Sequence, residues 1–488
     1  MSREPLVGGV PAEELAVWHQ VRRFAVPGWM IESATGARLA GDWREACAVA
    51  AVDIALDPAR IGASHGGAVR AAVEADLAHL APDLLRWHLP RALAAGTMLM
   101  GGRTVVLARH GGRGPGSRAG APAACLVVRT PARDAPQRLV LDFVAADDPG
   151  LRREYLVDDW TAFRHFWDAR RAPELRAWCG GDAGRLPFFL ADGTPLGPGE
   201  LPDTDPGPAD PVAREEWIAV LQARGDTVAA FAAAGVETDL ATWGPPSPWG
   251  GPPPEAVITK LPLDLPRIVR EVRRLRAAGD AARFRIPGAY RGDVLLEPAG
   301  PGAHAGLRAH AGAPYASTGV PTIPGTVWRR LPDLQLVRTG RLTPEELHPL
   351  VAAALFPASG TACGPPGPPA VLEPVRVRCG GEWHLVGFRD GELRIPHSPR
   401  EQQREQALLA FGGAVSGCFA VRRAWATGRG QLPRALRPLR REAFERARHG
   451  DAPGIAALLA AGLDPAVRDT ETGRSLAEVL GPLAPEAG

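Results

Sequence analysis

The sequence predicts an α+β multidomain protein, and three observations lead to that class. The N-terminal part carries apolar residues at helical spacing, short β-branched runs between turn residues follow, and two proline- and glycine-rich segments interrupt the later chain. With 488 residues, the chain is also long for one hydrophobic core. We expect mixed helical and antiparallel-sheet N-terminal and middle parts, followed by a helical C-terminal domain.

Apolar spacing and capping residues predict the N-terminal helices. Residues 11–24 form an amphipathic stretch, and a second stretch covers 68–89, where Pro82 should split the helix. Asp42 can cap a helix between them, because Glu45 follows three residues later as the reciprocal partner. We therefore expect the chain to open with several helices.

Three β-branched runs then predict an antiparallel meander at 103–109, 124–130 and 137–143. Residues 154–178 return to a helical pattern rich in Trp and Phe, and 188–196 predict a strand with an Asp-Gly turn.

Helices are expected at 213–234 and 265–278, and capping boxes with proline in the first position predict helices after Thr343 and Ser398. The weakly polar run 407–421 is too short to span a membrane and predicts a buried helix, a glycine break and a second helix.

The prolines of 244–254 and 362–369 predict domain boundaries, because consecutive prolines fit neither a helix interior nor a central strand. The predicted division is a mixed α+β domain at 1–243, a linker at 244–254, a smaller α+β domain at 255–360, a three-stranded meander at 371–397 and a helical domain at 398–488.

The charge balance argues against a nucleic-acid partner. Net charge is +2, so no global field would draw the chain to DNA or an anionic membrane. Lys260 is the only lysine and asparagine is absent, which indicates a GC-rich genome in which arginine is the default cation. The nine arginines of 422–448 are therefore interpreted as a solvated helix face.

The cysteines and the N-terminus predict a cytoplasmic protein. The six cysteines are far apart and none forms a C-x-x-C pair, which is typical of reduced thiols rather than a disulfide framework. The N-terminus carries no apolar segment of signal-peptide length.

Motifs for catalysis or cofactors are weak. The glycine-rich loop 110–120 follows a strand but lacks the Lys-Ser/Thr ending and the following helix that a phosphate site needs. Ser416 does not lie in a nucleophile elbow, and Asp158-Asp159 is more typical of a helix cap. We predict no catalytic residue and no cofactor.

A zinc site can be imagined from two cysteines and two histidines in the C-terminal part. Cys379 and His384 barely fit the paired spacing of zinc ligands, and His397 and Cys418 are isolated. A cysteine ending one strand and a histidine within the next is the favoured interpretation, so no metal site is predicted.

The C-terminal segment 439–480 gives the most specific pattern. From Ala447 to Leu476 the sequence is ARHGDAPGIAALLAAGLDPAVRDTETGRSL, in which Gly450 ends one helix, Gly462 ends the next and Ser475 caps a third. This resembles one ankyrin repeat followed by part of a second. The chain as a whole resembles uncharacterised ankyrin repeat-containing proteins of high-GC bacteria.

The resemblance implies a non-catalytic scaffold that binds a protein partner. It implies contacts through the exposed loop and the preceding helix, at Arg448, Arg468, Asp469 and Glu471. The family's T-P-L-H start is missing and the second unit stops early, so one repeat cannot bury its apolar face alone. We expect it to pack as a terminal cap on the helices of 399–427.

An enzyme or small-ligand-binding domain in residues 1–243 is the alternative. Strands, tryptophans and histidines concentrate there, and a pocket would need converging polar side chains such as those of His88, His110, Asp158 or His165.

Overall fold

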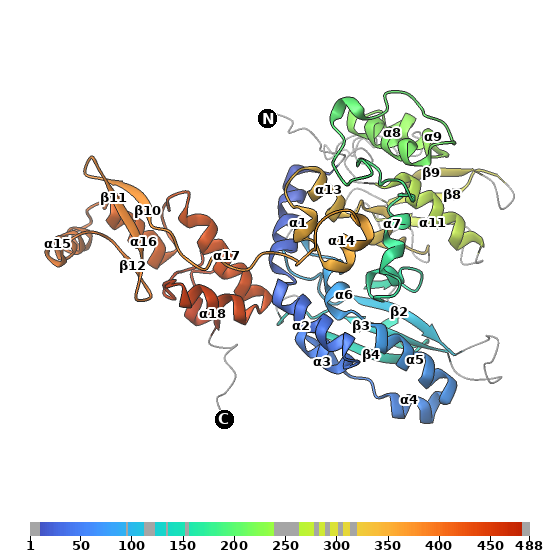
Figure 1. The fold of residues 1–488 in the computed structure, drawn as a ribbon, viewed down its shortest axis with the longest axis horizontal. Helices are drawn as coiled ribbons and strands as arrows, with labels where there is room; N and C mark the ends of the chain where they lie inside the picture. Colours follow the sequence, from blue (N-terminus) through green and yellow to red (C-terminus); the bar gives the residue numbers. More distant parts are fainter. Residues whose placement is uncertain are drawn as a thin grey trace. The chain divides into compact units, whose positions relative to one another are not determined.

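The chain forms two compact units, Met1–Pro365 (unit 1) and Pro366–Gly488 (unit 2), and the division falls inside the proline-rich segment 362–369 (Figure 1). The computed structural model describes residues 10–93, 96–111, 123–132, 135–151, 156–238, 263–277, 283–287, 293–300, 306–312 and 320–480. Helices combine with three sheets, which confirms the α+β class. No helix among these residues is long and apolar enough to cross a bilayer.

The first sheet of unit 1 has the strand order β1-β4-β3-β2-β5. The predicted meander is its centre, because β2 pairs antiparallel with β3 and β3 with β4. The edge strands β1 and β5 pair in parallel and come from short segments without a strong strand pattern. The strands are β1 (Val52–Ile54), β2 (Thr104–His110), β3 (Ala124–Arg129), β4 (Leu139–Ala145) and β5 (Val157–Asp159).

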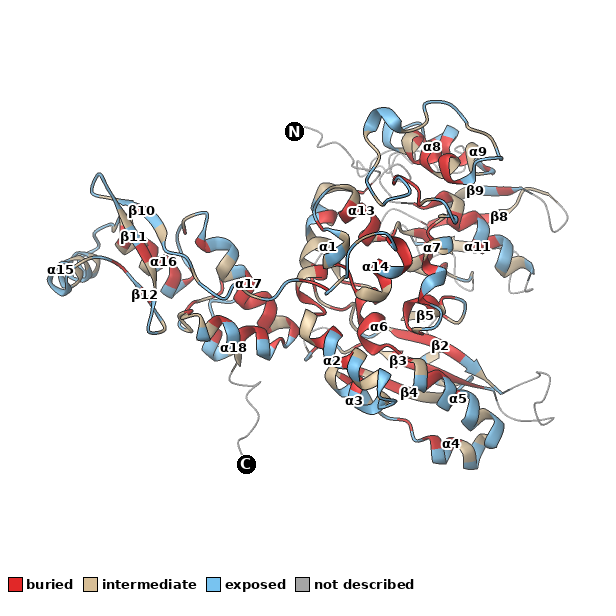
Figure 2. Ribbon diagram, viewed as in Figure 1, coloured by how far each residue is buried: buried red, intermediate tan, exposed pale blue. Residues whose placement is uncertain are grey.

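Both faces of this sheet are covered. Alternate residues such as Val105 and Leu126 join the main core, whereas Val106 and Val127 form a small cluster on the other face. Figure 2 shows much of β2 and β3 as buried. Helices supply the rest of the core: α1 (Ala12–Phe24), α2 (Gly28–Leu39), α3 (Trp43–Val49), α4 (Pro58–His65), α5 (Gly67–His79), α6 (Pro82–His88), α7 (Leu175–Trp178), α8 (Pro211–Arg224), α9 (Thr227–Ala233), α11 (Leu265–Ala277), α12 (Gly325–Trp328), α13 (Pro332–Arg338) and α14 (Pro349–Leu355).

Local signals placed several of these helices correctly. Asp42 accepts a hydrogen bond from the Glu45 backbone N–H at 3.0 Å, and Pro82 begins α6 after the end of α5. Other predictions were wrong. Residues 156–178 hold β5, short 3-10 turns and the single turn α7 rather than a continuous helix, and Thr343 caps only a 3-10 turn at Pro344–Glu346.

At 188–196 the predicted Asp-Gly turn is present, but the predicted strand is not. Gly193 has φ +88° in the turn, and its backbone N–H donates to the Leu190 carbonyl at 3.0 Å. Only an isolated bridge joins Phe189 to Pro195, and Phe188 has φ +72°, outside the strand region.

The predicted separation of a domain at 1–243 from a domain at 255–360 is wrong, because the second sheet contains strands from both segments. Its order is β6-β9-β8-β7, and β6 (Val236–Thr238) pairs in parallel with β9 (Leu307–Gly312), so both predicted domains contribute to one sheet. One core also contains Phe231 and Ile268. The other two strands are β7 (Phe284–Ile286) and β8 (Asp293–Pro298). The predicted linker 244–254 lies outside the described residues.

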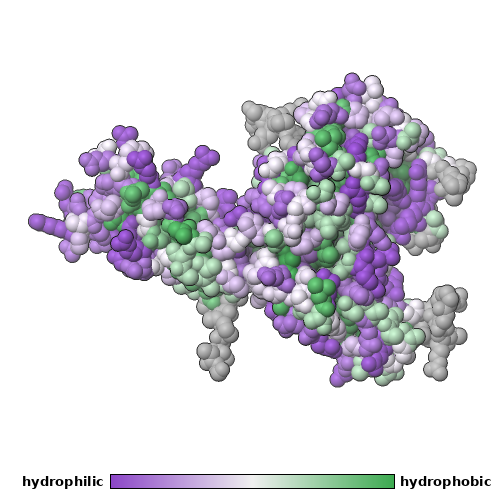
Figure 3. Space-filling model, in the orientation of Figure 1, coloured by the Kyte–Doolittle hydropathy of each residue, from purple (hydrophilic) through white to green (hydrophobic). Residues whose placement is uncertain are grey.

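Unit 2 likewise unites the predicted meander and helical domain around one core. Its elements are β10 (Val375–Cys379), β11 (Glu382–Arg389), β12 (Glu392–Arg394), α15 (Pro399–Ala410), α16 (Gly417–Thr427), α17 (Leu436–His449), α18 (Ala452–Ala460) and α19 (Leu476–Leu480). Ser398 caps α15 as predicted, but α15 buries no residue and Phe411 after it is 91% exposed. The expected buried helix was therefore wrong. Figure 3 shows hydrophilic residues over much of the visible surface, with small apolar patches among them.

A buried ion pair joins the two ends of unit 1. Arg22 of α1 donates to both carboxylate oxygens of Asp333 in α13, at 2.9 and 2.7 Å. Arg22 also donates to the Trp87 carbonyl at 2.7 Å, and the Trp87 indole N–H donates to Asp333 at 2.9 Å. Every polar contact in this triad crosses between elements far apart in the chain, so it fixes α1, α6 and α13 together.

We predict that Asp333→Ala destabilises unit 1 by about 3–5 kcal/mol, because it leaves a buried guanidinium without its carboxylate. Asp53→Ala is the matched control, since its ion pair with Arg138 is half exposed and should contribute only about 0–1 kcal/mol. Chemical denaturation of both variants measures the difference. Equal losses would contradict the role given to the Arg22–Asp333 pair.

Candidate metal centre

Two of the four Cys and His side chains weighed in the sequence lie on one face of a hairpin. Cys379 pairs with Glu382 and Val377 pairs with His384 across β10 and β11, so Cys379 and His384 are diagonal neighbours. Gly380 and Gly381 make the tight turn between the strands with φ of +60° and +92°. The hairpin therefore presents a sulfur and an imidazole side by side.

The other two side chains come from later elements of unit 2. His397 follows β12, and Cys418 lies in the first turn of α16. Gly417 makes this approach possible: a Cβ there would lie 2.5 Å from Cys379 Sγ and 2.9 Å from Cys379 Cα, and its φ is +58°. Any larger residue would push the start of α16 away from β10.

The four ligand atoms form a compact cluster, all within 4.8 Å of one another. His384 Nδ1 lies 3.2 Å from His397 Nε2, Cys379 Sγ lies 3.6 Å from His397 Nε2, and Cys418 Sγ lies 3.5 Å from His384 Nδ1. Ideal tetrahedral zinc, with Zn–N near 2.0–2.1 Å and Zn–S near 2.3 Å, gives ligand–ligand edges of about 3.3–3.8 Å. The three distances are close to that range, so the donors fit a Cys₂His₂ zinc site.

Carboxylates face the outward nitrogen of each imidazole. Glu382 Oε2 lies 3.9 Å from His384 Nε2, and Glu401 Oε2 lies 3.9 Å from His397 Nδ1. Metal-bound histidines commonly direct their second nitrogen to such a group, which fixes the ring and its tautomer. Glu401 is itself held by Ser398, whose backbone N–H and hydroxyl donate to it at 2.7 and 2.8 Å. These hydrogen bonds lower the pKa of Glu401 and keep it charged.

The Cys418 thiol is protonated unless a cation is present. Burial, followed by the neighbouring Cys379, raises the pKa of Cys418 to about 12. A bound divalent cation reverses this effect because it binds the thiolate, releasing the proton.

The site is suited to structure rather than catalysis. Four protein donors complete a zinc tetrahedron and leave no position for a substrate or an activated water. Cys418 is fully buried, so it cannot serve as a nucleophile for an external substrate. The sequence analysis named these four residues but predicted no metal site, because four, twelve and twenty residues separate successive ligands.

The predicted partner-binding residues contact one another. Arg448 forms ion pairs with Asp469 at 3.2 Å and with Glu471 at 3.5 Å, and it donates to Glu445 at 2.7 Å. Arg468 pairs with Glu478 at 3.3 Å. Asp469 is only 8% exposed, whereas Glu471 and Arg468 remain accessible. Much of this charge therefore holds the loop to α17.

The expected cap on residues 399–427 forms on one helix only. The Arg468 backbone N–H donates to the Trp425 carbonyl at 3.2 Å, and the core of unit 2 contains Trp425 of α16 together with Phe444 and Leu458. Since α15 buries nothing, the C-terminal helices pack on α16 and not on α15.

The side chains named for the alternative pocket serve other roles. His88 and His165 lie beside Phe166 in the core, with ring centroids 4.6 and 4.3 Å away. His110 pairs with Asp76 at 3.1 Å, and Asp158 pairs with Arg103 at 2.9 Å.

The core histidines are also poor bases. Burial, followed by nearby arginines, lowers the pKa of His165 to about 3, and burial lowers the pKa of His88 well below its ordinary value. A general base works best with a pKa near the operating pH.

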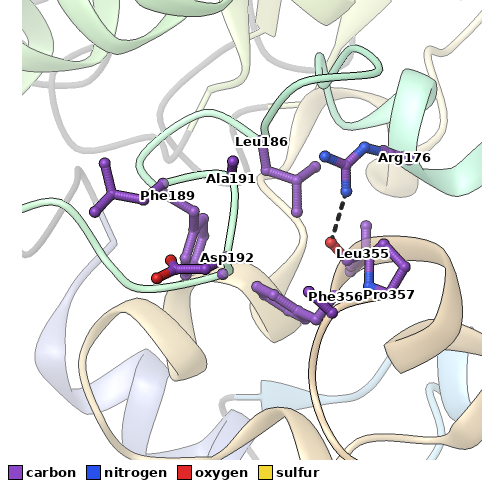
Figure 4. A pocket seen from close by; sticks show the side chains of 11 residues that line it. Arg176, Leu186, Phe189, Ala191, Asp192, Leu355, Phe356 and Pro357 are labelled. Atoms are coloured by element: carbon purple, nitrogen blue, oxygen red, sulfur yellow. Dashed lines mark hydrogen bonds between the residues drawn. The ribbon is translucent and has the colours of Figure 1, made fainter.

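Two hollows in unit 1 involve none of those four residues. The first is shallow and lined mainly by apolar side chains, with Arg176 donating to the Leu355 carbonyl at 2.9 Å (Figure 4). The second is lined by Glu215, Asp264, Arg267 and Arg330 among others. Burial, followed by Asp264, raises the pKa of Glu215 there. Ion pairs to Arg270 and Arg267 engage these two carboxylates, so the hollow presents no free acid–base pair.

Comparison with known proteins adds no relative: no family model, no curated protein and no solved structure matches the chain.

Acid should destabilise unit 1 through its core histidines. His165 stays neutral in the folded chain down to about pH 3, whereas in the unfolded chain its imidazole takes up the proton near the ordinary histidine pKa of 6.5. Stability is thus present above pH 6.5 and is lost as pH falls toward 3, by up to about 1.4 kcal/mol per pH unit for each such group.

We predict that His165→Phe, a ring replacement in an aromatic cluster, flattens this acid limb. The part-buried His79, changed to Gln, is the control and should leave the slope unchanged. Denaturation midpoints measured between about pH 4 and pH 8, the range around the ordinary histidine pKa, give the slopes. Identical slopes in wild type and His165→Phe would refute the assignment.

Proposed function

We propose that the protein is a non-catalytic interaction protein whose C-terminal unit is a zinc-stabilised module. The proposal rests on the arrangement of four side chains, whose ligand atoms have separations that suit tetrahedral zinc: Cys379, His384, His397 and Cys418. Zinc supplies the charge that keeps both thiolates ionised. Among the chain's own residues, Glu382 and Glu401 lie 3.9 Å from the outward imidazole nitrogens, where they would favour the orientation that binds the metal, and Cys418 is buried from water.

The metal would join the sheet of unit 2 to its helices. Two ligands come from β10 and β11, one from the segment after β12, and one from α16. The core between these elements is small, and small domains often need a metal to supplement it. Structural zinc sites contribute directly to folding free energy, so the expected role is to fix α16 against the sheet.

The protein-binding part of the proposal rests on the C-terminal helices. Gly450 and Gly462 have φ of +72° and +95°, and Ser475 and Glu478 exchange hydrogen bonds at 2.9 and 3.1 Å. These features support the resemblance of 439–480 to an ankyrin repeat, whose family binds proteins. With one helix pair packed on α16, the repeat would act as part of unit 2 and not as an independent array.

Elemental analysis of the purified full chain tests the metal. We predict one zinc per chain in the wild type and loss of that zinc in Cys418→Ser and His397→Ala. Cys363→Ser is the control, because Cys363 is exposed and lies outside the cluster. A wild-type chain purified without zinc that fails to take it up in solution would refute the proposal.

Glu401→Gln gives a finer test of the same site. We predict zinc affinity about 10–100-fold weaker, because the carboxylate that orients His397 is lost while the amide oxygen can still cap α15. Glu405→Gln, one turn further along the same helix, should leave affinity unchanged. Competition with a chromophoric chelator measures both variants. Equal affinities would show that Glu401 does not support the ligand.

A further inference from the structure

The outer face of the three-stranded sheet in unit 2 is uncovered. Strand alternation places Val377, Val386 and Leu393 on the buried face. The residues of the other face are exposed except for Gly387, which is partly covered, and Trp383 and Leu385 are 58% and 61% exposed. They are two residues apart on β11, so both apolar side chains stand on the same side of the sheet.

Arginines surround this apolar pair. Arg378 lies opposite Trp383 and Arg376 lies opposite Leu385 in the antiparallel register, and the Arg376 guanidinium lies 5.5 Å from the Trp383 ring centroid. Arg389 continues the same face of β11. Glu392 is the acid on this face, and it pairs with Arg394 at 3.1 Å. Among the described residues, Arg376, Arg378 and Arg389 have no carboxylate partner.

We propose that this face, Arg376, Arg378, Trp383, Leu385 and Arg389, binds an acidic protein segment that carries apolar anchors. The inference deepens the proposed interaction function and names the chemistry of the partner. Trp and Arg are the residues most enriched at binding hot spots, and charge complementarity selects a negatively charged partner. The adjacent metal site would hold the strands rigid, which reduces the entropy lost on binding.

The composition of the face favours a protein over single-stranded nucleic acid. Nucleic-acid platforms stack successive bases on several aromatic rings, whereas this face has one aromatic and one aliphatic side chain. Leu385 gains little from a base but buries well against an apolar side chain of a peptide.

The probe is a fluorescein-labelled peptide in which Asp and Glu alternate with Leu and Phe, titrated with the zinc-loaded full chain. We predict a saturable rise in anisotropy, weakened about thirtyfold by Trp383→Ala and by the double variant R376E/R378E. The matched controls are Leu408→Ala and R400E/R404E, which change exposed apolar and basic residues of α15. They should bind as the wild type does.

Three results would overturn the proposal: no binding of the acidic peptide, equal loss in the control variants, or tighter binding of an oligothymidylate of about 12 nucleotides. A concentration-dependent dimer that Trp383→Ala abolishes would also overturn it, because the occupant would then be a second copy. Zinc content is measured in every variant. Since these side chains point away from the ligand face, full zinc with no peptide binding would refute this inference alone and leave the metal site standing.

Discussion

Two cysteine sulfur atoms, of which the Cys418 Sγ is buried, lie with two imidazole nitrogens within 4.8 Å of one another and set the main constraint on unit 2. Without a cation, burial keeps the pKa of the Cys418 thiol raised, and the cluster offers only weak hydrogen bonds between soft groups. With a divalent cation, four elements are fixed at one point. Because α16 provides Cys418 at its start and Trp425 near its end, the same helix connects the metal cluster to the C-terminal helices. The position of the ankyrin-like segment thus depends on the closure of the site.

Unit 1 is stabilised in a different way. Its core is large, and buried ion pairs such as that of Arg22 with Asp333 lie inside it. Histidines that would be candidates for catalysis in sequence lie in this core as neutral aromatic rings. Burial that stabilises the fold therefore removes the proton affinity that a general base needs. The proposed zinc site and the proposed binding face both lie in the smaller unit.

The sequence predicted local structure well where a short segment contains the whole signal. The cap at Asp42, the break at Pro82 and the three central strands needed only neighbouring residues. The parallel edge strands β1 and β5 and the pairing of β6 with β9 depend on partners far along the chain, so no local pattern could reveal them.

The same difference between local and long-range signals applies to the metal cluster. The Gly380-Gly381 turn and strand alternation would have placed Cys379 and His384 on one face, and this signal was present in the sequence. The approach of α16 could not be predicted, because it depends on packing between segments separated by a sheet and a helix. Gly417 was the one residue that hinted at it, since only glycine allows the helix start to lie against Cys379.

X-ray absorption at the zinc edge on the purified full chain tests the central claim most directly. The account predicts a first shell of two sulfur atoms at about 2.3 Å and two nitrogen atoms at about 2.0 Å, with the multiple scattering typical of imidazole. A first shell made only of oxygen and nitrogen donors, or a spectrum without sulfur, would contradict a Cys₂His₂ centre in unit 2.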